Sequence, residues 1–270
     1  AKQQAVVEAN RIKAAAQAEV ERDVQQAREE LRGRDLAMIF QNPRTALNPI
    51  RKVGQQIEDV LQAHNPGMSA KERKETAIEQ IANVKITDPA RRYNAYPYEL
   101  SGGMCQRVAL AMTLACQPRL LIADEPTTAL DVGVQAKILL LLKRKNRDSR
   151  LPIVVITHDF GVVRAIASRV LVMYAGQVQE EGAVDDVLEQ PLHPYTQALI
   201  SSVPDPEAGD GPMRQIPGEP PSLIEIPGGC RFAPRCPSVH ERCRKEIPIL
   251  HALDRGRKVR CHLLDDGKRP

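Results

Sequence analysis

Two adjacent carboxylates follow a short apolar run near the middle of the chain. Residues 120–123 are apolar, and Asp124, Glu125 and Pro126 come directly after them. A buried strand of this kind ends at the edge of a sheet, where ligands bind in open α/β folds. One carboxylate can help to hold Mg²⁺, and the other can orient or deprotonate an attacking water. The pattern therefore predicts a site that brings a magnesium ion and a reactive water together.

A serine and two glycines lie upstream of this strand. Ser101, Gly102 and Gly103 precede a run of small apolar residues that is typical of a helix. Glycines let backbone N–H groups approach an anion, and the N-terminus of the following helix favours negative charge. Such a triplet is often only a turn, but its position before the carboxylate strand favours an anion-binding role.

A histidine follows a second apolar run. Residues 153–156 are aliphatic, and Thr157 and His158 come after them. A lone histidine at a strand end is more often structural than catalytic. With the other two motifs upstream, a hydrogen bond from His158 to a terminal phosphate is the favoured interpretation.

Strand and helix patterns alternate through the central part of the chain. This alternation predicts a parallel sheet that helices cover on both faces, and hence an α/β core. Residues 50–90 are expected to be helical, with a break at residues 66–67. The predicted strands are 36–40, 120–123, 153–156 and 170–174, and the predicted helices include 134–145 and 160–167.

Composition divides the chain into four segments. Residues 1–33 form a polar helical segment, and residues 34–203 form the core, with a helical subdomain at about 50–117. Residues 204–229 are rich in proline and glycine and are predicted to be an irregular linker. Residues 230–270 form a small, irregular module rich in cysteine.

Composition also bears on partners. Apolar residues make up 42% of the chain, which is enough for a packed core, and a formal net charge of +4 is too weak to favour nucleic acid. No apolar stretch is long enough to span a bilayer, and the N-terminal residues do not look like a signal peptide. Any membrane role is therefore expected to be peripheral, through partner proteins.

Taken in order, these motifs closely resemble those of the ABC transporter ATPase family. The resemblance covers residues 34–202 and implies an α/β ABC-type nucleotide-binding cassette, with a mostly parallel sheet and a helical subdomain. Residues 39–43 are similar to the Q-loop of the family, 100–104 to its signature motif, 120–125 to Walker B, 129–131 to the D-loop, and His158 to the switch histidine.

The resemblance implies a transport ATPase that uses ATP and Mg²⁺, with a role for each matched residue. Glu125 is expected to act as the general base, and Asp124 to support Mg²⁺. Gln41 is expected to contact both Mg²⁺ and the attacking water. His158 is expected to hold the γ-phosphate.

Cassettes of this family pair head to tail, which gives further residues a role in the dimer. Ser101, Gly102 and Gly103 are expected to close over ATP that the partner cassette holds. Asp131 is expected to communicate across the interface.

Three segments narrow the resemblance to ATPases of oligopeptide and dipeptide importers. They are residues 48–49, residues 193–196 and the cysteine-containing tail. This resemblance implies uptake of peptides or similar small solutes at the cytoplasmic face of the inner membrane. The implied partners are a second ABC cassette, two transmembrane permease subunits and, indirectly, an extracytoplasmic solute-binding protein, without nucleic acid.

Four cysteines fall within the basic C-terminal segment. Four thiolates in a segment with so small a core suggest a metal that supplies folding energy. Their spacing is neither that of common zinc ribbons nor that of a standard ferredoxin. The resemblance implies a [4Fe–4S] cluster, while zinc and thiols without metal, or a disulfide, stay open. The expected ligands are Cys230, Cys236, Cys243 and Cys261.

One motif of the family does not occur in these 270 residues. A phosphate-binding loop, GxxxxGK followed by Ser or Thr, is expected ahead of Gln41 and is absent. Its lysine and backbone N–H groups are the main contacts to the β- and γ-phosphates. The favoured explanation is that the sequence is part of a longer polypeptide. The alternatives are a degenerate, non-hydrolysing regulatory subunit that lends its signature motif to a partner, and a damaged reading frame.

Overall fold

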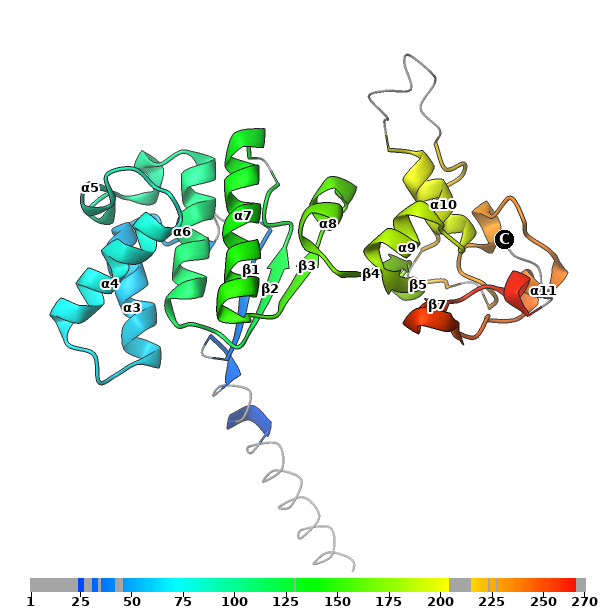
Figure 1. The fold of residues 1–270 in the computed structure, drawn as a ribbon, viewed down its shortest axis with the longest axis horizontal. Helices are drawn as coiled ribbons and strands as arrows, with labels where there is room; N and C mark the ends of the chain where they lie inside the picture. Colours follow the sequence, from blue (N-terminus) through cyan, green and yellow to red (C-terminus); the bar gives the residue numbers. More distant parts are fainter. Residues whose placement is uncertain are drawn as a thin grey trace, which may run out of the picture. The chain divides into compact units, whose positions relative to one another are not determined.

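The computed structural model describes residues 24–26, 31–33, 35–41, 46–128, 130–203, 215–222, 224–226 and 228–265. The chain forms two compact units, residues 1–158 and 159–270 (Figure 1). The helix expected over residues 1–31 lies outside the described residues, except for helical residues 24–26 and 31.

A three-stranded parallel sheet organises the first unit. Strands β1 (Leu36–Ile39), β2 (Leu120–Asp124) and β3 (Ile153–Ile156) lie in the order β1-β2-β3. Leu36 pairs with Leu120 and Asp124 with Ile156, so the carboxyl ends of β2 and β3 meet at one edge. The parallel sheet predicted from alternating strands and helices is confirmed here.

The helices of this unit form an arm and a cover for the sheet (Figure 1). Helix α6 (Gly102–Ala115) packs against β1, and α7 (Val132–Ser149) connects β2 to β3. In the arm, α4 packs on both α3 and α6, and the predicted break at residues 66–67 separates α3 from α4. The remaining arm elements are α3 (Val53–His64), α4 (Ala70–Asn83), α5 (Pro89–Tyr93) and η1 (Pro97–Glu99).

The two faces of the parallel sheet differ in burial. One face carries Ala37 and Leu121, which are 5% and 0% exposed. The other carries Met38, Val154 and Ile156, which are 37%, 50% and 50% exposed. Parallel sheets are normally buried on both faces. The prediction of helices on both faces is therefore wrong for the described part of this unit.

The second unit is built around an antiparallel sheet in the order β4-β5-β7-β6. A tight turn at Ala175 and Gly176, both with positive φ, joins β4 (Arg169–Tyr174) to β5 (Gln177–Ala183). The predicted strand 170–174 is therefore present, but it forms a hairpin instead of extending the parallel sheet. A two-residue loop with positive φ at both positions favours this hairpin.

Helices and short elements complete this unit. Its helices are α8 (Phe160–Ile166), α9 (Val184–Glu189), α10 (Pro194–Ser201) and α11 (Glu241–Lys245), its short strands are β6 (His251–Ala252) and β7 (Lys258–Val259), and its 3-10 turns are η2 (Ala233–Arg235), η3 (Asp254–Gly256) and η4 (His262–Leu264). None of the helices that the structure describes is both long and apolar enough to cross a membrane.

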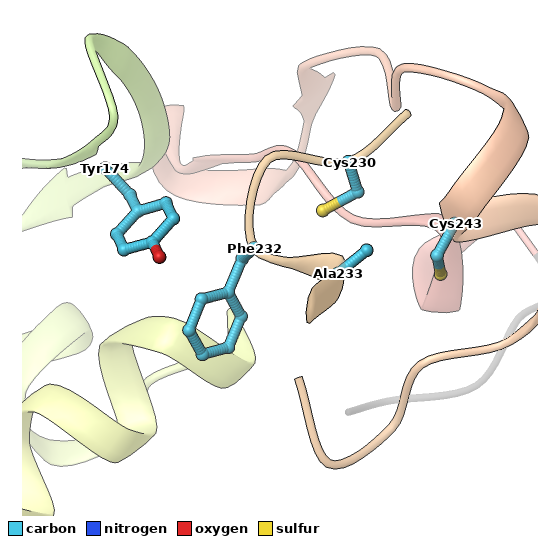
Figure 2. Packing of buried hydrophobic residues seen from close by; sticks show 5 residues of the cluster. All are labelled: Tyr174, Cys230, Phe232, Ala233 and Cys243. Carbon is cyan, nitrogen blue, oxygen red and sulfur yellow. The ribbon is translucent and has the colours of Figure 1, made fainter. Parts of the chain in front are cut away.

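The cysteine-containing tail is integrated with residues 159–203. Strand β7 pairs with β5, and the Phe232 ring lies edge-on to Tyr174 of β4, with 5.3 Å between the ring centroids. Figure 2 shows Tyr174 and Phe232 beside Cys230, Ala233 and Cys243, which together form a buried cluster. The tail thus shares a sheet and a core with the preceding residues, whereas composition alone suggests a separate module.

Candidate active site and cysteine cavity

Glu125 lies where β2 turns away from the sheet. Its backbone has a φ of +44°, and its N–H donates to the carbonyl oxygen of Ile156, at the end of β3, over 2.9 Å. A positive φ is uncommon for a residue other than glycine and occurs often at functional sites. The turn therefore holds Glu125 at the carboxyl ends of two parallel strands, as predicted.

Three side chains converge on the Glu125 carboxylate. Gln41 Nε2 donates to Oε2 over 3.2 Å, and Thr128 Oγ1 donates to the same oxygen over 2.7 Å. His158 Nδ1 lies 2.9 Å from Oε1. The structure thus brings together Gln41, Glu125 and His158, which are far apart in the sequence, and it adds Thr128. Thr128 belongs to the polar run after Pro126, a signal that sequence reasoning passed over.

These partners keep Glu125 ionised. The hydrogen bond from Thr128 and then that from His158 hold the pKa of the Glu125 carboxyl below its ordinary value. An ionised carboxylate can accept a proton from, or orient, a nearby water. The His158 side chain is 78% exposed, so a ligand can reach it.

The other two predicted acids have different surroundings. Asp124 is the last residue of β2 and is partly buried beside Glu125. Asp131 caps α7, because its Oδ1 accepts from the N–H of Val134 over 2.9 Å. Burial lowers the pKa of Arg107 in α6, and the negative charge of Asp131 partly opposes this shift.

The signature-like residues begin α6. Ser101 is its N-cap, and its Oγ accepts from the N–H of Met104 over 3.3 Å. A Cβ on Gly103 would lie 3.1 Å from the Leu130 side chain, so the close approach of these segments favours glycine. The hydrogen bond of Ser101 is made within the start of α6 and does not involve Glu125.

A buried glutamine links α6 to the turn of Glu125. Gln106 is 1% exposed, and its Nε2 donates to the carbonyl oxygen of Pro126 over 3.0 Å. Sequence reasoning missed this contact, since Gln106 lies in a helix and only its burial marks it. Asn42, Pro43 and Ala129, which belong to the matched motifs, lie outside the described residues.

Four cysteines of the second unit surround one small cavity. None of these four cysteines forms a disulfide, so the structure contradicts that alternative. Cys230 donates its backbone N–H to the carbonyl oxygen of Cys243 over 2.8 Å. A Cβ on Gly229 would lie 2.3 Å from that oxygen, so only glycine permits this approach. The cysteines that line the cavity are Cys230, Cys236, Cys243 and Cys261.

The thiols are largely buried, and they lie close enough together for one to affect the pKa of another. Burial raises the pKa of Cys236 and of Cys261 to about 11, and the neighbouring thiols add to both shifts. Among the residues that the structure describes, no group of three or more His, Cys, Asp or Glu side chains is arranged to hold a metal ion. The sulfurs thus share a cavity without converging on one ion.

Two family models match different parts of the chain. The family described as "ABC transporter" matches residues 8–128, and that described as "Oligopeptide/dipeptide transporter, C-terminal region" matches residues 179–243. The dipeptide transport ATP-binding protein DppD of Haemophilus influenzae is 47% identical over 87% of this chain and 71% of its own length. The chain belongs to the ATP-binding subunits of oligopeptide and dipeptide ABC transporters.

Other members of this ABC family are similar to the same degree. The oligopeptide transport ATP-binding protein OppD of Salmonella typhimurium is 48% identical over 86% of this chain and 68% of its own length. Among solved structures, the dimeric cassette MJ0796 bound to ADP and Pi has a TM-score of 0.53 and 33% identity. That match covers 58% of this chain and 66% of the MJ0796 chain. The α/β cassette fold is thereby confirmed.

Proposed function

We propose that this chain is the ATP-hydrolysing subunit of an importer for dipeptides, oligopeptides or similar small solutes, with Glu125 as its general base. The observation that carries the proposal is the convergence of Gln41 and His158 on the Glu125 carboxylate. A base needs to be ionised and within reach of the water that it activates. The lowered pKa of Glu125 and its place at the sheet edge meet these conditions.

The contacts around Glu125 suggest a separate role for each residue once nucleotide binds. Gln41 and His158, which both contact the carboxylate, would turn toward the attacking water and the γ-phosphate. Thr128 would stay on Glu125 and keep it ionised. Asp124 would support Mg²⁺, whose charge stabilises the transferred phosphoryl group. Each role transfers a proton or holds an oxygen without any covalent bond to the protein.

A second cassette would complete the site. Ser101, Gly102 and Gly103 begin a helix of 14 residues, so their backbone N–H groups can bind a phosphate that the partner holds. Asp131 interacts electrostatically with Arg107 of this helix. The dimeric state of the similar MJ0796 cassette supports this arrangement.

The phosphate-binding loop would come from polypeptide outside these 270 residues. Met38, Val154 and Ile156 leave one sheet face apolar and exposed, and β3 is an edge strand. A further strand, loop and helix would bury this face, as parallel sheets require. The alternative function, a non-hydrolysing subunit that lends only its signature motif, is favoured by the absence of GxxxxGK from the sequence.

For the four cysteines we propose a [4Fe–4S] cluster, with zinc as the alternative. The donor chemistry fits, because four thiols, three of them buried and one partly buried, line one cavity. Zinc would use the same four thiolates, since a tetrahedral site of four cysteines is common for that ion. When bound, the cluster would cross-link a tail whose own core is small. Equal iron and sulfide in anaerobically purified protein supports the cluster, and zinc alone rejects it.

Transport tests the whole proposal. The partners would be a second cassette, two permease subunits and, indirectly, an extracytoplasmic solute-binding protein, with this chain peripheral at the cytoplasmic face of the membrane. The complete complex can be reconstituted in proteoliposomes. Transport of a labelled dipeptide across the membrane should then require ATP on the side of the membrane where the cassettes lie. ATP binding by the isolated chain distinguishes the two candidates, since a degenerate subunit binds no nucleotide in its own site. Complete complexes that neither hydrolyse ATP nor move peptide reject the importer.

A further inference from the structure

Gln106 is a buried polar residue on α6, the helix that begins with the signature-like residues. It is 1% exposed and lies about one helical turn after Gly102. Its Nε2 donates to the backbone carbonyl oxygen of Pro126 over 3.0 Å, and this hydrogen bond is buried. Pro126 directly follows Glu125, so the bond ends one residue beyond the proposed base.

Glu125 lies in a backbone turn that is anchored at several points. Its φ of +44° is a conformation that persists where the surroundings hold it in place. The N–H of Glu125 donates to the carbonyl oxygen of Ile156 over 2.9 Å, and its carbonyl oxygen accepts from the N–H of Thr128 over 3.2 Å. Pro126 is buried and has no N–H, so its backbone can form hydrogen bonds only through its carbonyl oxygen. Gln106 supplies that bond from α6.

A second contact of α6 lies further along the same turn. A Cβ on Gly103 would lie 3.1 Å from the Leu130 side chain. Gly103 and Gln106 are three residues apart, so they lie on one face of the helix. The helix therefore meets the chain at Pro126 and again at Leu130, on either side of Thr128. These two contacts fix the turn against α6.

The amide of Gln106 is paired at one end only. Within the part of the chain that the structure describes, Nε2 is bonded to Pro126 and Oε1 has no hydrogen-bond partner. A buried acceptor without a partner costs stability, and an apolar side chain of the same length would avoid that cost. Packing alone therefore does not require a glutamine here, whereas the buried carbonyl oxygen of Pro126 does require a donor.

We propose that Gln106 is a positioning residue for Glu125, acting through the carbonyl oxygen of Pro126. This role rests on the proposed function of Glu125 as the general base. Gln106 touches neither nucleotide nor water in this role. Loss of its N–H lets the turn shift against α6, and the Glu125 carboxylate moves with the turn. A displacement of about 1 Å from the reactive geometry can slow a reaction about 100-fold, while the contacts that bind ATP stay in place.

Steady-state ATP hydrolysis by the full-length subunit in its complex, with Mg²⁺, tests the proposal. Gln106→Met keeps an unbranched side chain of similar length and removes the donor. We expect kcat to fall about 10–100-fold with little change in the KM for ATP. Gln106→Asn, whose amide is one methylene shorter and does not reach Pro126, should behave in the same way. A wild-type kcat in either folded variant overturns the proposal.

A buried glutamine of the second unit provides the matched control. Gln179 is 0% exposed, and its Nε2 donates to the backbone carbonyl oxygen of Gln177 over 3.3 Å. Its Oε1 likewise has no partner among the described residues. Gln179→Met should hydrolyse ATP at the wild-type rate. A loss of kcat in Gln179→Met equal to that in Gln106→Met would show that any buried amide has this effect, and would overturn the proposal.

A double variant separates positioning from a general loss of structure. If Gln106 acts through Glu125, adding Gln106→Met to Glu125→Gln removes nothing further. The double variant should then hydrolyse ATP within about twofold of Glu125→Gln alone. Losses that multiply overturn the positioning role of Gln106. Hydrolysis by Glu125→Gln at the wild-type rate rejects Glu125 as the base and the role of Gln106 with it, whereas a slow Glu125→Gln beside a fully active Gln106→Met rejects Gln106 alone.

Discussion

The two units satisfy their charged groups in opposite ways. In the second unit, Glu180 is fully buried and is held by Arg257 and two backbone N–H groups. In the first, the Glu125 carboxylate meets Gln41 and His158 at an open sheet edge, with His158 78% exposed. A buried, matched pair fixes a structure, because breaking it leaves a charge without a partner. Exposed partners can exchange one acceptor for another, which a site for nucleotide requires.

The apolar surfaces of the two units also differ in burial. The cluster of Tyr174, Phe232 and the cysteines is buried within its own unit (Figure 2). The parallel sheet instead leaves Val154 and Ile156 half exposed. The apolar side chains of the second unit's cluster are thus covered by residues of that unit, whereas one face of the parallel sheet keeps its apolar side chains partly exposed.

The largest effect is expected from a substitution that breaks the buried ion pair of Arg257 and Glu180. Arg257→Ala leaves Glu180 without its charged partner, so we expect the second unit to lose about 3–5 kcal/mol of stability. Chemical denaturation at neutral pH, followed by hydrogen exchange in residues 177–203, measures this loss. The exposed Arg244→Ala is the control and should change stability by less than about 0.5 kcal/mol. Equal denaturation midpoints for the two variants would show that the pair does not anchor the unit.

A smaller effect tests the arm of the first unit without touching its open site. Ser69 and Glu72 form a capping box at the start of α4, with bonds of 3.3 and 2.8 Å. Ser69→Ala should cost about 1 kcal/mol, and Ser69→Thr, which keeps the hydroxyl, should cost less. Thermal unfolding detects the difference. Loss of ATP hydrolysis far beyond this cost would mean that the arm and the site are coupled more tightly than the contacts suggest.

The smallest effect sharpens the account of the open site. The Thr128 hydroxyl is the main cause of the lowered pKa of Glu125. Thr128→Val removes it, so the pKa rises toward its ordinary value and the base is protonated at a higher pH than before. The acid limb of kcat/KM for ATP in the assembled complex should therefore move to higher pH. Thr128→Ser keeps the hydroxyl and should leave the acid limb of the pH profile unchanged. An unchanged acid limb in Thr128→Val would show that Thr128 does not set the pKa of Glu125.

Sequence reasoning located the strand ends that carry Glu125 and His158, since apolar runs followed by polar residues mark them. It also placed the α3–α4 break at residues 66–67. These features are local, because a strand or a helix break depends on neighbouring residues. The order of the motifs then allowed the Glu125 site to be predicted before any contact was known.

Other features could not be derived in this way because they depend on contacts between distant residues. Strand β5 contains Glu180 and Glu181, which conceal it from a hydrophobic pattern. The buried Arg257, far along the chain, and two backbone N–H groups together make a charge at position 180 tolerable. The hydrogen bond from Gln106 to Pro126 is likewise set by packing of α6.

The proposed role of Glu125 as the general base can be tested on the enzyme itself. The most direct measurement is the steady-state rate of ATP hydrolysis by the full-length subunit in its complex with Mg²⁺. Glu125→Gln should lower kcat by about 10²–10⁴-fold with little change in the affinity for ATP, and the exposed Glu79→Gln should hydrolyse ATP at the wild-type rate. Hydrolysis by Glu125→Gln as fast as by the wild type would contradict the account.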